Sequence, residues 1–212
     1  MVKKPRVILA EDHKLVAEAL RNFIASDFDV VAIARNGHEL LAFAESLKPD
    51  AIVVDIAMPL LNGLEAGRQL KEQMPGVKLI FLTMNDDPDL AREAMDAGAS
   101  GYVLKRSDAS ELLDALSAAI RGKSYVTRQI ARGMQESFIR DPNGRGRARS
   151  VTPRQRQVVQ LLAEGKSMKE AADVLKVTPR TVAFHKYRLM QDLGLKTSAE
   201  VVQFAVKNRI VI

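Results

Sequence analysis

Short runs of apolar residues alternate with longer amphipathic segments through the first 122 residues of this 212-residue chain. The runs are rich in Val and Ile and lie at 6–10, 30–34, 51–54, 79–82 and 101–104. Between them, apolar residues recur at helical spacing, for example at Leu112, Leu113, Leu116 and Ile120. The alternation predicts five strands joined by helices, and right-handed βαβ crossovers make the sheet parallel.

The predicted strands are continuously apolar, which is typical of strands that helices cover on both faces. Five such units fit a doubly wound, flavodoxin-like sheet with the strand order 2-1-3-4-5. We therefore expect an α/β domain over residues 1–122.

A change in composition follows. Residues 127–138 have helical spacing, and residues 140–150 contain one Pro, two Gly and four Arg but no large apolar residue. Such a segment cannot pack into a core, so we assign 123–150 to a linker helix and a flexible basic linker. Beyond it, the pattern predicts an all-α domain over 151–212 with four short helices, near 153–163, 168–175, 179–193 and 198–207.

Capping residues mark the ends of these helices. Thr152 and Thr178 each precede a proline, as an N-cap does when proline occupies the first helical position. Ser167 and Glu170 have the spacing of a capping box. Gly194 stands where a helix should end. These signals favour a compact helical domain with short turns.

The two parts of the chain differ in charge, although its net charge is +6. Residues 1–122 contain 14 Lys/Arg against 19 Asp/Glu, whereas residues 123–212 contain 18 against 7. An acidic part joined to a basic part is expected when one binds a cation and the other a polyanion such as nucleic acid. Random surface charge is the alternative.

Composition also excludes several classes of protein. The absence of Cys excludes disulfides, thiol catalysis and Cys-ligated metal sites. With three His, a His-rich metal site is not expected. Because no apolar run reaches 18 residues and no signal-peptide pattern is present, we expect a cytoplasmic protein with no membrane partner.

Polar residues follow four of the predicted strands, namely Glu11, Asp12, Asp55, Thr83 and Lys105. Ligands of open parallel sheets bind beyond the carboxyl ends of the strands, and the order 2-1-3-4-5 places Asp55 centrally. Three carboxylates at one edge need a cation, and their oxygens suit Mg²⁺. With a lysine and a hydroxyl they predict a phosphoryl site in which an Asp can be the nucleophile. For any single residue, the alternative is an ordinary turn position.

Residues 6–122 resemble the receiver domain of two-component response regulators. The matching motifs are Ile8-Leu-Ala-Glu-Asp-His13, Val54-Asp-Ile-Ala-Met-Pro59 with Gly63, Leu82-Thr-Met84 and Gly101-Tyr-Val-Leu-Lys105. The resemblance implies that Asp55 accepts a phosphoryl group from a sensor histidine kinase, with Thr83 and Lys105 at the same site.

The resemblance also implies roles for neighbouring residues. Asp12, Asp55 and the backbone carbonyl of Ala57 would ligate Mg²⁺, with Glu11 acting through water. Thr83 and Tyr102 would form a switching pair, although an aromatic residue beside a buried strand usually packs in the core. Ala57 has no side chain that could orient water, which favours slow autodephosphorylation. The expected chemistry is Mg²⁺-dependent autophosphotransfer and slow autodephosphorylation at Asp55 only, and the chain is not otherwise an enzyme.

Residues 151–212 carry 11 Lys/Arg against 5 Asp/Glu and resemble a LuxR-type helix-turn-helix DNA-binding domain. The matching stretches are Val151-Thr-Pro-Arg154, Leu161-Leu-Ala-Glu-Gly-Lys-Ser167, Lys169-Glu170, Val177-Thr-Pro-Arg-Thr-Val182, His185 and Leu193-Gly-Leu-Lys196. The second helix of such a motif enters the major groove.

We expect Val182, Leu189 and Met190 to face the core and the opposite side of the helix to be exposed. The expected DNA-contacting residues are Lys169, Thr178, Arg180, Thr181, Ala183, Phe184, Lys186, Tyr187 and Arg188. Ala183, Phe184 and Tyr187 differ from the small polar or basic residues usual at these positions, so the preferred DNA sequence stays open.

Taken together, the chain resembles a NarL/FixJ-type, DNA-binding response regulator of a two-component phosphorelay. The expected partners are a sensor histidine kinase, double-stranded DNA, and a second copy of the chain after phosphorylation, with RNA polymerase as a further candidate. Val202 and Ala205 belong either to a dimer surface or to the core. A phosphatase with an aspartate nucleophile is disfavoured, because Ala57 stands where its general acid/base is needed. A DNA-binding protein whose receiver no longer signals is the other alternative.

Overall fold

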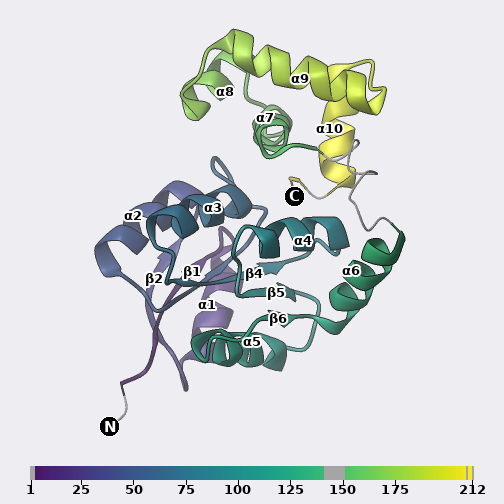
Figure 1. Ribbon diagram of the computed structural model, residues 1–212. Helices are drawn as coiled ribbons and strands as arrows, with labels where there is room; N and C mark the ends of the chain where they lie inside the picture. Colours follow the sequence, from purple (N-terminus) through teal and green to yellow (C-terminus); the bar gives the residue numbers. More distant parts are fainter. Residues whose placement is uncertain (1–2, 141–150, 209, 212) are drawn as a thin grey trace. The chain divides into compact units, whose positions relative to one another are not determined.

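The structure is a computed structural model that describes residues 3–140, 151–208 and 210–211. Contacts divide the chain into two units, Met1–Pro142 and Asn143–Ile212, and each has its own hydrophobic core (Figure 1). The flexible linker predicted at 140–150 lies almost entirely outside the described residues. Within them, no helix combines the length and the apolar character needed to span a membrane.

The first unit contains a parallel sheet with the strand order β2-β1-β3-β4-β5-β6. The first five strands lie within one residue of their predicted bounds, and they are β1 (Arg6–Ala10), β2 (Asp29–Ala34), β3 (Ala51–Val54), β4 (Lys78–Thr83) and β5 (Gly101–Leu104). The flavodoxin-like order is confirmed, but the predicted number of strands was wrong. A sixth strand, β6 (Tyr125–Val126), pairs with β5, and its two residues are too few to produce an apolar run in the sequence.

Helices cover both faces of the sheet, which explains why its strands are continuously apolar (Figure 1). One face packs against α1 (Lys14–Ile24) and α5 (Ser110–Ile120). The other face packs against α2 (Gly37–Leu47), α3 (Gly63–Gln73) and α4 (Pro88–Asp96). Neighbouring residues of a strand therefore enter different cores.

The helix predicted at 127–138 forms as α6 (Arg128–Arg140) and packs against α4. Its Gly133 lies so close to Pro88 that a Cβ would be 2.6 Å from Pro88 Cγ. Arg92 of α4 donates a hydrogen bond from Nη2 to the backbone oxygen of Met134, 3.2 Å away. The sequence placed this helix in the linker, whereas its packing makes it part of the first unit.

Within residues 151–208 and 210–211, the second unit contains four helices at the predicted positions, namely α7 (Pro153–Ala163), α8 (Met168–Leu175), α9 (Pro179–Leu193) and α10 (Ser198–Lys207). Thr152, Ser167 and Thr178 are N-caps whose side chains accept backbone N–H groups, and Ser167 forms the predicted capping box with Glu170. Gly194 ends α9 with a φ of +69°, a conformation that favours glycine.

Two small cores fix the orientation of α9. Val182 packs with residues of α7 and α8, and Leu189 packs with residues of α7 and α10. Met190 is partly buried against the second of these cores. The predicted core-facing residues are therefore confirmed, and the opposite side of α9 faces solvent.

Candidate functional site

The carboxyl ends of four neighbouring strands bring the predicted polar side chains to one edge of the sheet. Glu11 and Asp12 follow β1, Asp55 follows β3, Thr83 ends β4 and Lys105 follows β5. Because β1, β3, β4 and β5 are consecutive in the sheet, these residues share the edge at which such folds bind ligands. Glu11, Asp55 and Thr83 are buried there.

Lys105 bridges the two buried acids. Its Nζ lies 2.6 Å from Asp55 Oδ2 and 2.5 Å from Glu11 Oε2. Burial lowers the pKa of the Lys105 ammonium, but the attraction of Asp55 and Glu11 outweighs burial and raises this pKa above its ordinary value. Lys105 is therefore a permanent cation beside the carboxylate that would receive a phosphoryl group.

The Asp55 side chain is 3% exposed and is held at both oxygens. Burial raises the pKa of its carboxyl group, although Lys105 acts in the opposite direction. Its Oδ1 accepts a hydrogen bond from the backbone N–H of Ala57 over 3.2 Å. A carboxylate oriented in this way can act as a nucleophile without first reorganising its surroundings.

Gly63 opens α3 against the backbone of Asp55. A Cβ on Gly63 would lie 1.9 Å from the Asp55 carbonyl oxygen, so a larger residue cannot take this position without displacing the loop. The Gly63 N–H donates a hydrogen bond to the backbone oxygen of Ile56 over 2.9 Å. The close packing of Gly63 against Asp55 and its hydrogen bond to Ile56 fix the conformation of the loop that follows β3.

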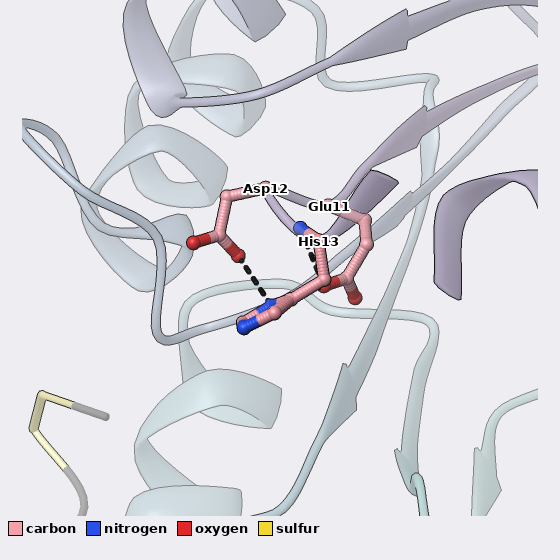
Figure 2. A group of neighbouring side chains, drawn as sticks. All are labelled: Glu11, Asp12 and His13. Carbon is pink, nitrogen blue, oxygen red and sulfur yellow. Dashed lines mark hydrogen bonds and ion pairs between the residues drawn. The ribbon is translucent and has the colours of Figure 1, made fainter. Parts of the chain in front are cut away.

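Glu11, Asp12 and His13 form a cluster whose side chains could hold a metal ion. Figure 2 shows the His13 imidazole near both carboxylates, with Nδ1 3.0 Å from Glu11 Oε1 and 3.0 Å from Asp12 Oδ1. Among the described residues, Asp12 Oδ1 is buried and, apart from this ion-pair contact with His13 Nδ1, has no hydrogen-bond partner. A buried carboxylate oxygen that no further donor satisfies fits a hard cation such as Mg²⁺.

His13 is the residue of this cluster that the sequence did not single out. It directly follows the Glu11–Asp12 pair, and that adjacency was the available signal. Asp55 does not belong to the same cluster and connects to Glu11 through Lys105.

Thr83 and Tyr102, the expected switching pair, both form a hydrogen bond with the backbone of Asn85. The Asn85 N–H donates a hydrogen bond to Thr83 Oγ1 over 3.2 Å, and the Tyr102 hydroxyl donates to the Asn85 carbonyl oxygen over 2.8 Å. Tyr102 is 0% exposed, so its ring already lies in the core between the sheet and α4. Asn85 leads into α4, which Asp87 caps through its side chain.

In the second unit, the helix-turn-helix is formed by α8 and α9 (Figure 1). The exposed residues predicted to contact DNA are Lys169, Thr178, Arg180, Phe184, Tyr187 and Arg188, and Thr181 and Ala183 are partly exposed. Thr178 also caps α9, because its Oγ1 accepts the N–H of Thr181 over 3.2 Å.

Lys186 departs from its predicted place on the exposed surface of α9. It is 9% exposed, and its Nζ donates a hydrogen bond to Ser198 Oγ over 2.7 Å. The expectation of a surface position was wrong, because Lys186 lies on the side of α9 that faces α10. Its ammonium is used within the second unit.

The structure also separates the two residues of α10 that the sequence left open. Ala205 is buried in the core with Val159, Leu189 and Val201. Val202, by contrast, is exposed. The core interpretation therefore holds for Ala205 and not for Val202.

Two family models match the chain. The response regulator receiver domain matches residues 7–117, and the luxR family of bacterial regulatory proteins matches residues 149–205. The uncharacterized transcriptional regulatory protein YxjL of Bacillus subtilis strain 168 is 35% identical over 213 residues, which cover 98% of this chain and 98% of that protein.

Solved structures show the same architecture. A two-component response regulator of the LuxR family from Aurantimonas sp. SI85-9A1 is 32% identical, with a TM-score of 0.63 over 65% of this chain and 99% of that one. RcsB from Salmonella enterica serovar Typhimurium, bound to promoter rprA with the phosphomimetic BeF₃⁻, is 24% identical, with a TM-score of 0.72 over 95% of this chain and 98% of that one. The second likeness shows the fold alone. By its two family matches and its full-length relative, this chain belongs to the two-component response regulators that join a receiver domain to a LuxR-type, helix-turn-helix DNA-binding domain.

Proposed function

We propose that phosphorylation of Asp55 by a sensor histidine kinase controls the dimerisation and the transcription-factor activity of this response regulator. The observation that carries the proposal is the position of Asp55 at the sheet edge. Its carboxylate is buried, lies 2.6 Å from the Lys105 ammonium and has Thr83 on the neighbouring strand.

The chemical step is a phosphoryl transfer to Asp55. A carboxylate oxygen attacks the phosphorus of a phosphohistidine, the phosphorus–nitrogen bond breaks with its electrons going to nitrogen, and an aspartyl phosphate forms. Lys105 then pairs with the added negative charge, and the Thr83 hydroxyl donates to a phosphate oxygen. We expect no other enzymatic activity, and slow loss of the phosphate because Ala57 cannot orient water.

Mg²⁺ is the proposed cofactor, held by Asp12, Asp55 and the backbone carbonyl of Ala57, with Glu11 acting through water. When bound, the ion supplies charge neutralisation for the incoming phosphoryl group. The buried, unsatisfied oxygen of Asp12 supports this assignment. Lys105, which is also paired with Glu11, holds the carboxylate of Asp55 in place.

The effect of a phosphate on Asp55 reaches the surface of the first unit through the loop before α4. A Thr83 hydroxyl that turns toward a phosphate leaves the Asn85 N–H, to which it is now bonded, and Tyr102 holds the carbonyl of the same residue. This loop leads into α4, and α6 packs against α4. A shift in a two-state equilibrium by a few kcal/mol is sufficient to change the surface that these helices present.

The LuxR-type unit supplies the contacts to double-stranded DNA. Its net positive charge suits phosphates, and the exposed side of α9 suits the major groove. A dimer would place two α9 helices on half-sites about one helical turn apart.

The proposed domains are 1–122 and 151–212, with α6 packed on the first. RNA polymerase is a further proposed partner, and the cytoplasm, where bacterial DNA is read, is the proposed location.

The test is light scattering coupled to gel filtration, with Mg²⁺ and beryllofluoride as the phosphate mimic. We expect the wild type to shift from monomer to dimer and Asp55→Ala to stay unchanged. Asp29→Ala is the matched control, because Asp29 is exposed at the opposite end of the sheet. An unchanged wild type, or a shift in Asp55→Ala equal to that of the wild type, would contradict control through Asp55.

A further inference from the structure

Two aromatic side chains project from the exposed side of α9. Phe184 is 64% exposed and Tyr187 is 58% exposed. Residues three apart on a helix lie on the same face, so the two rings form one patch, which we call the α9 aromatic pair. Exposed apolar groups of this size on adjoining positions mark a surface that a partner covers.

Neighbouring side chains hold both rings. The Phe184 ring meets the His185 ring edge to face, with centroids 5.4 Å apart. The Lys186 ammonium lies 5.4 Å from the centre of the Tyr187 ring, and its bond to Ser198 ties it to α10. Each ring of the α9 aromatic pair therefore has a neighbour that restricts its rotation, which lowers the entropic cost of binding.

Cationic side chains flank the pair along the helix. Arg180 lies one turn before Phe184 and Arg188 one turn after it, and both are exposed. Arg188 Nε also lies 3.3 Å from Asp192 Oδ1, and this ion pair orients the arginine side chain along the helix. An apolar centre with cations on both sides is complementary to a polyanion that carries apolar groups between its charges, and poorly complementary to a purely apolar protein surface.

The DNA major groove meets this description at one kind of base. Thymine alone carries a methyl group in the groove, between the phosphates of the two strands. Ala183, beside Phe184, has only a methyl side chain, so the helix can approach the base edges closely. These features identify the chemistry that the α9 aromatic pair can recognise.

We propose that Phe184, with Tyr187 beside it, reads thymine methyl groups, so that the preferred operator has thymine where the α9 aromatic pair meets each half-site. The inference rests on the proposed DNA-binding function and names the feature of the DNA that this helix selects. It makes Phe184 a specificity-determining residue rather than a source of general affinity.

The test begins with selection of duplexes from a random library by the full-length protein with Mg²⁺ and beryllofluoride. The dissociation constant of the best duplex is then measured by fluorescence anisotropy, with each thymine replaced in turn by deoxyuridine, which lacks only the methyl group. We expect about three- to fivefold weaker binding at each contacted thymine, the effect of one buried methyl. This substitution leaves the protein unchanged, so folding does not affect the result.

Phe184→Ala should bind the thymine and deoxyuridine duplexes equally. Val206→Ala is the matched control, because Val206 is also an exposed apolar residue but lies on α10, and it should keep the discrimination. Tight binding by the wild type that is indifferent to deoxyuridine overturns this inference and leaves DNA binding intact. Discrimination that survives in Phe184→Ala also overturns it. Failure to select any duplex overturns the DNA-binding proposal and this inference together.

Discussion

The hydroxyl of Tyr102 donates a hydrogen bond to the backbone oxygen of Asn85, 2.8 Å away. The N–H of the same Asn85 donates to Thr83 Oγ1. Thr83 and Tyr102 thus bind opposite sides of one residue, and a movement of either changes the position of the loop that begins α4. The relationship gives the expected switching pair a direct physical connection.

Tyr102→Phe should reduce the stability of the first unit by about 1 kcal/mol, because a buried hydrogen bond is lost without a change in packing. Hydrogen exchange of the slowest amides in β4 and β5 measures this unit alone. Tyr187→Phe, which removes an exposed hydroxyl from the second unit, is the control and should leave these amides unchanged. Equal exchange in both variants would mean that the Tyr102 hydrogen bond contributes nothing to stability.

Asp55→Asn should stabilise the first unit at neutral pH. Burial raises the pKa of the Asp55 carboxyl in the folded state, so ionisation of this group opposes folding. This cost is absent below the ordinary pKa of 3.8, where Asp55 is protonated in both the folded and the unfolded state, so the two proteins should converge there. The cost grows as pH rises through the folded pKa, so the wild type should lose stability relative to Asp55→Asn over that range.

Calorimetry of both proteins between pH 3 and pH 8, with the transitions of the two units resolved, measures the difference. Asp29→Asn serves as the exposed control and should show no comparable gain. A gain for Asp55→Asn that persists below pH 3.8, or a loss of stability at neutral pH, contradicts the assigned cost of ionisation.

Gly133→Ala should loosen α6 despite the better helix propensity of Ala, which by itself favours the helix by about 1 kcal/mol. The reason is the contact with Pro88, since the new Cβ would lie 2.6 Å from the proline ring. Hydrogen exchange of the α6 amides should become faster. Gln135→Ala, on an exposed position of the same helix, should leave exchange unchanged or slow it. Slower exchange in Gly133→Ala would show that α6 does not depend on this contact.

Arg180→Met and Lys186→Met should differ in their effect on DNA binding. Arg180 is exposed, and loss of one phosphate contact lowers the slope of log affinity against log salt by about one. Lys186 binds Ser198, and Met keeps its apolar stem, so its slope should match that of the wild type. Anisotropy titrations at several salt concentrations give both slopes. An equal decrease for both variants would place the Lys186 ammonium on DNA.

Local patterns in the sequence determined much of the molecule. Continuous apolar runs identified five of the strands, because strands buried on both faces leave no polar alternation. Capping residues such as Thr152 and Ser167 located the helices of the second unit, because a side chain that satisfies free N–H groups acts within a few residues. Asp55 and Lys105 could be placed at one edge because all parallel strands end on the same side.

The tertiary structure decided what depends on contacts between distant segments. Lys186 is buried on the side of α9 where Ser198 of another helix accepts its hydrogen bond, and Ala205 is buried because three helices, α7, α9 and α10, meet around it. The two residues of β6 become a strand only beside β5, and α6 belongs to the first unit only through its packing on α4. A helical pattern shows which residues share a face, but the elements that pack against that face decide which residues solvent reaches.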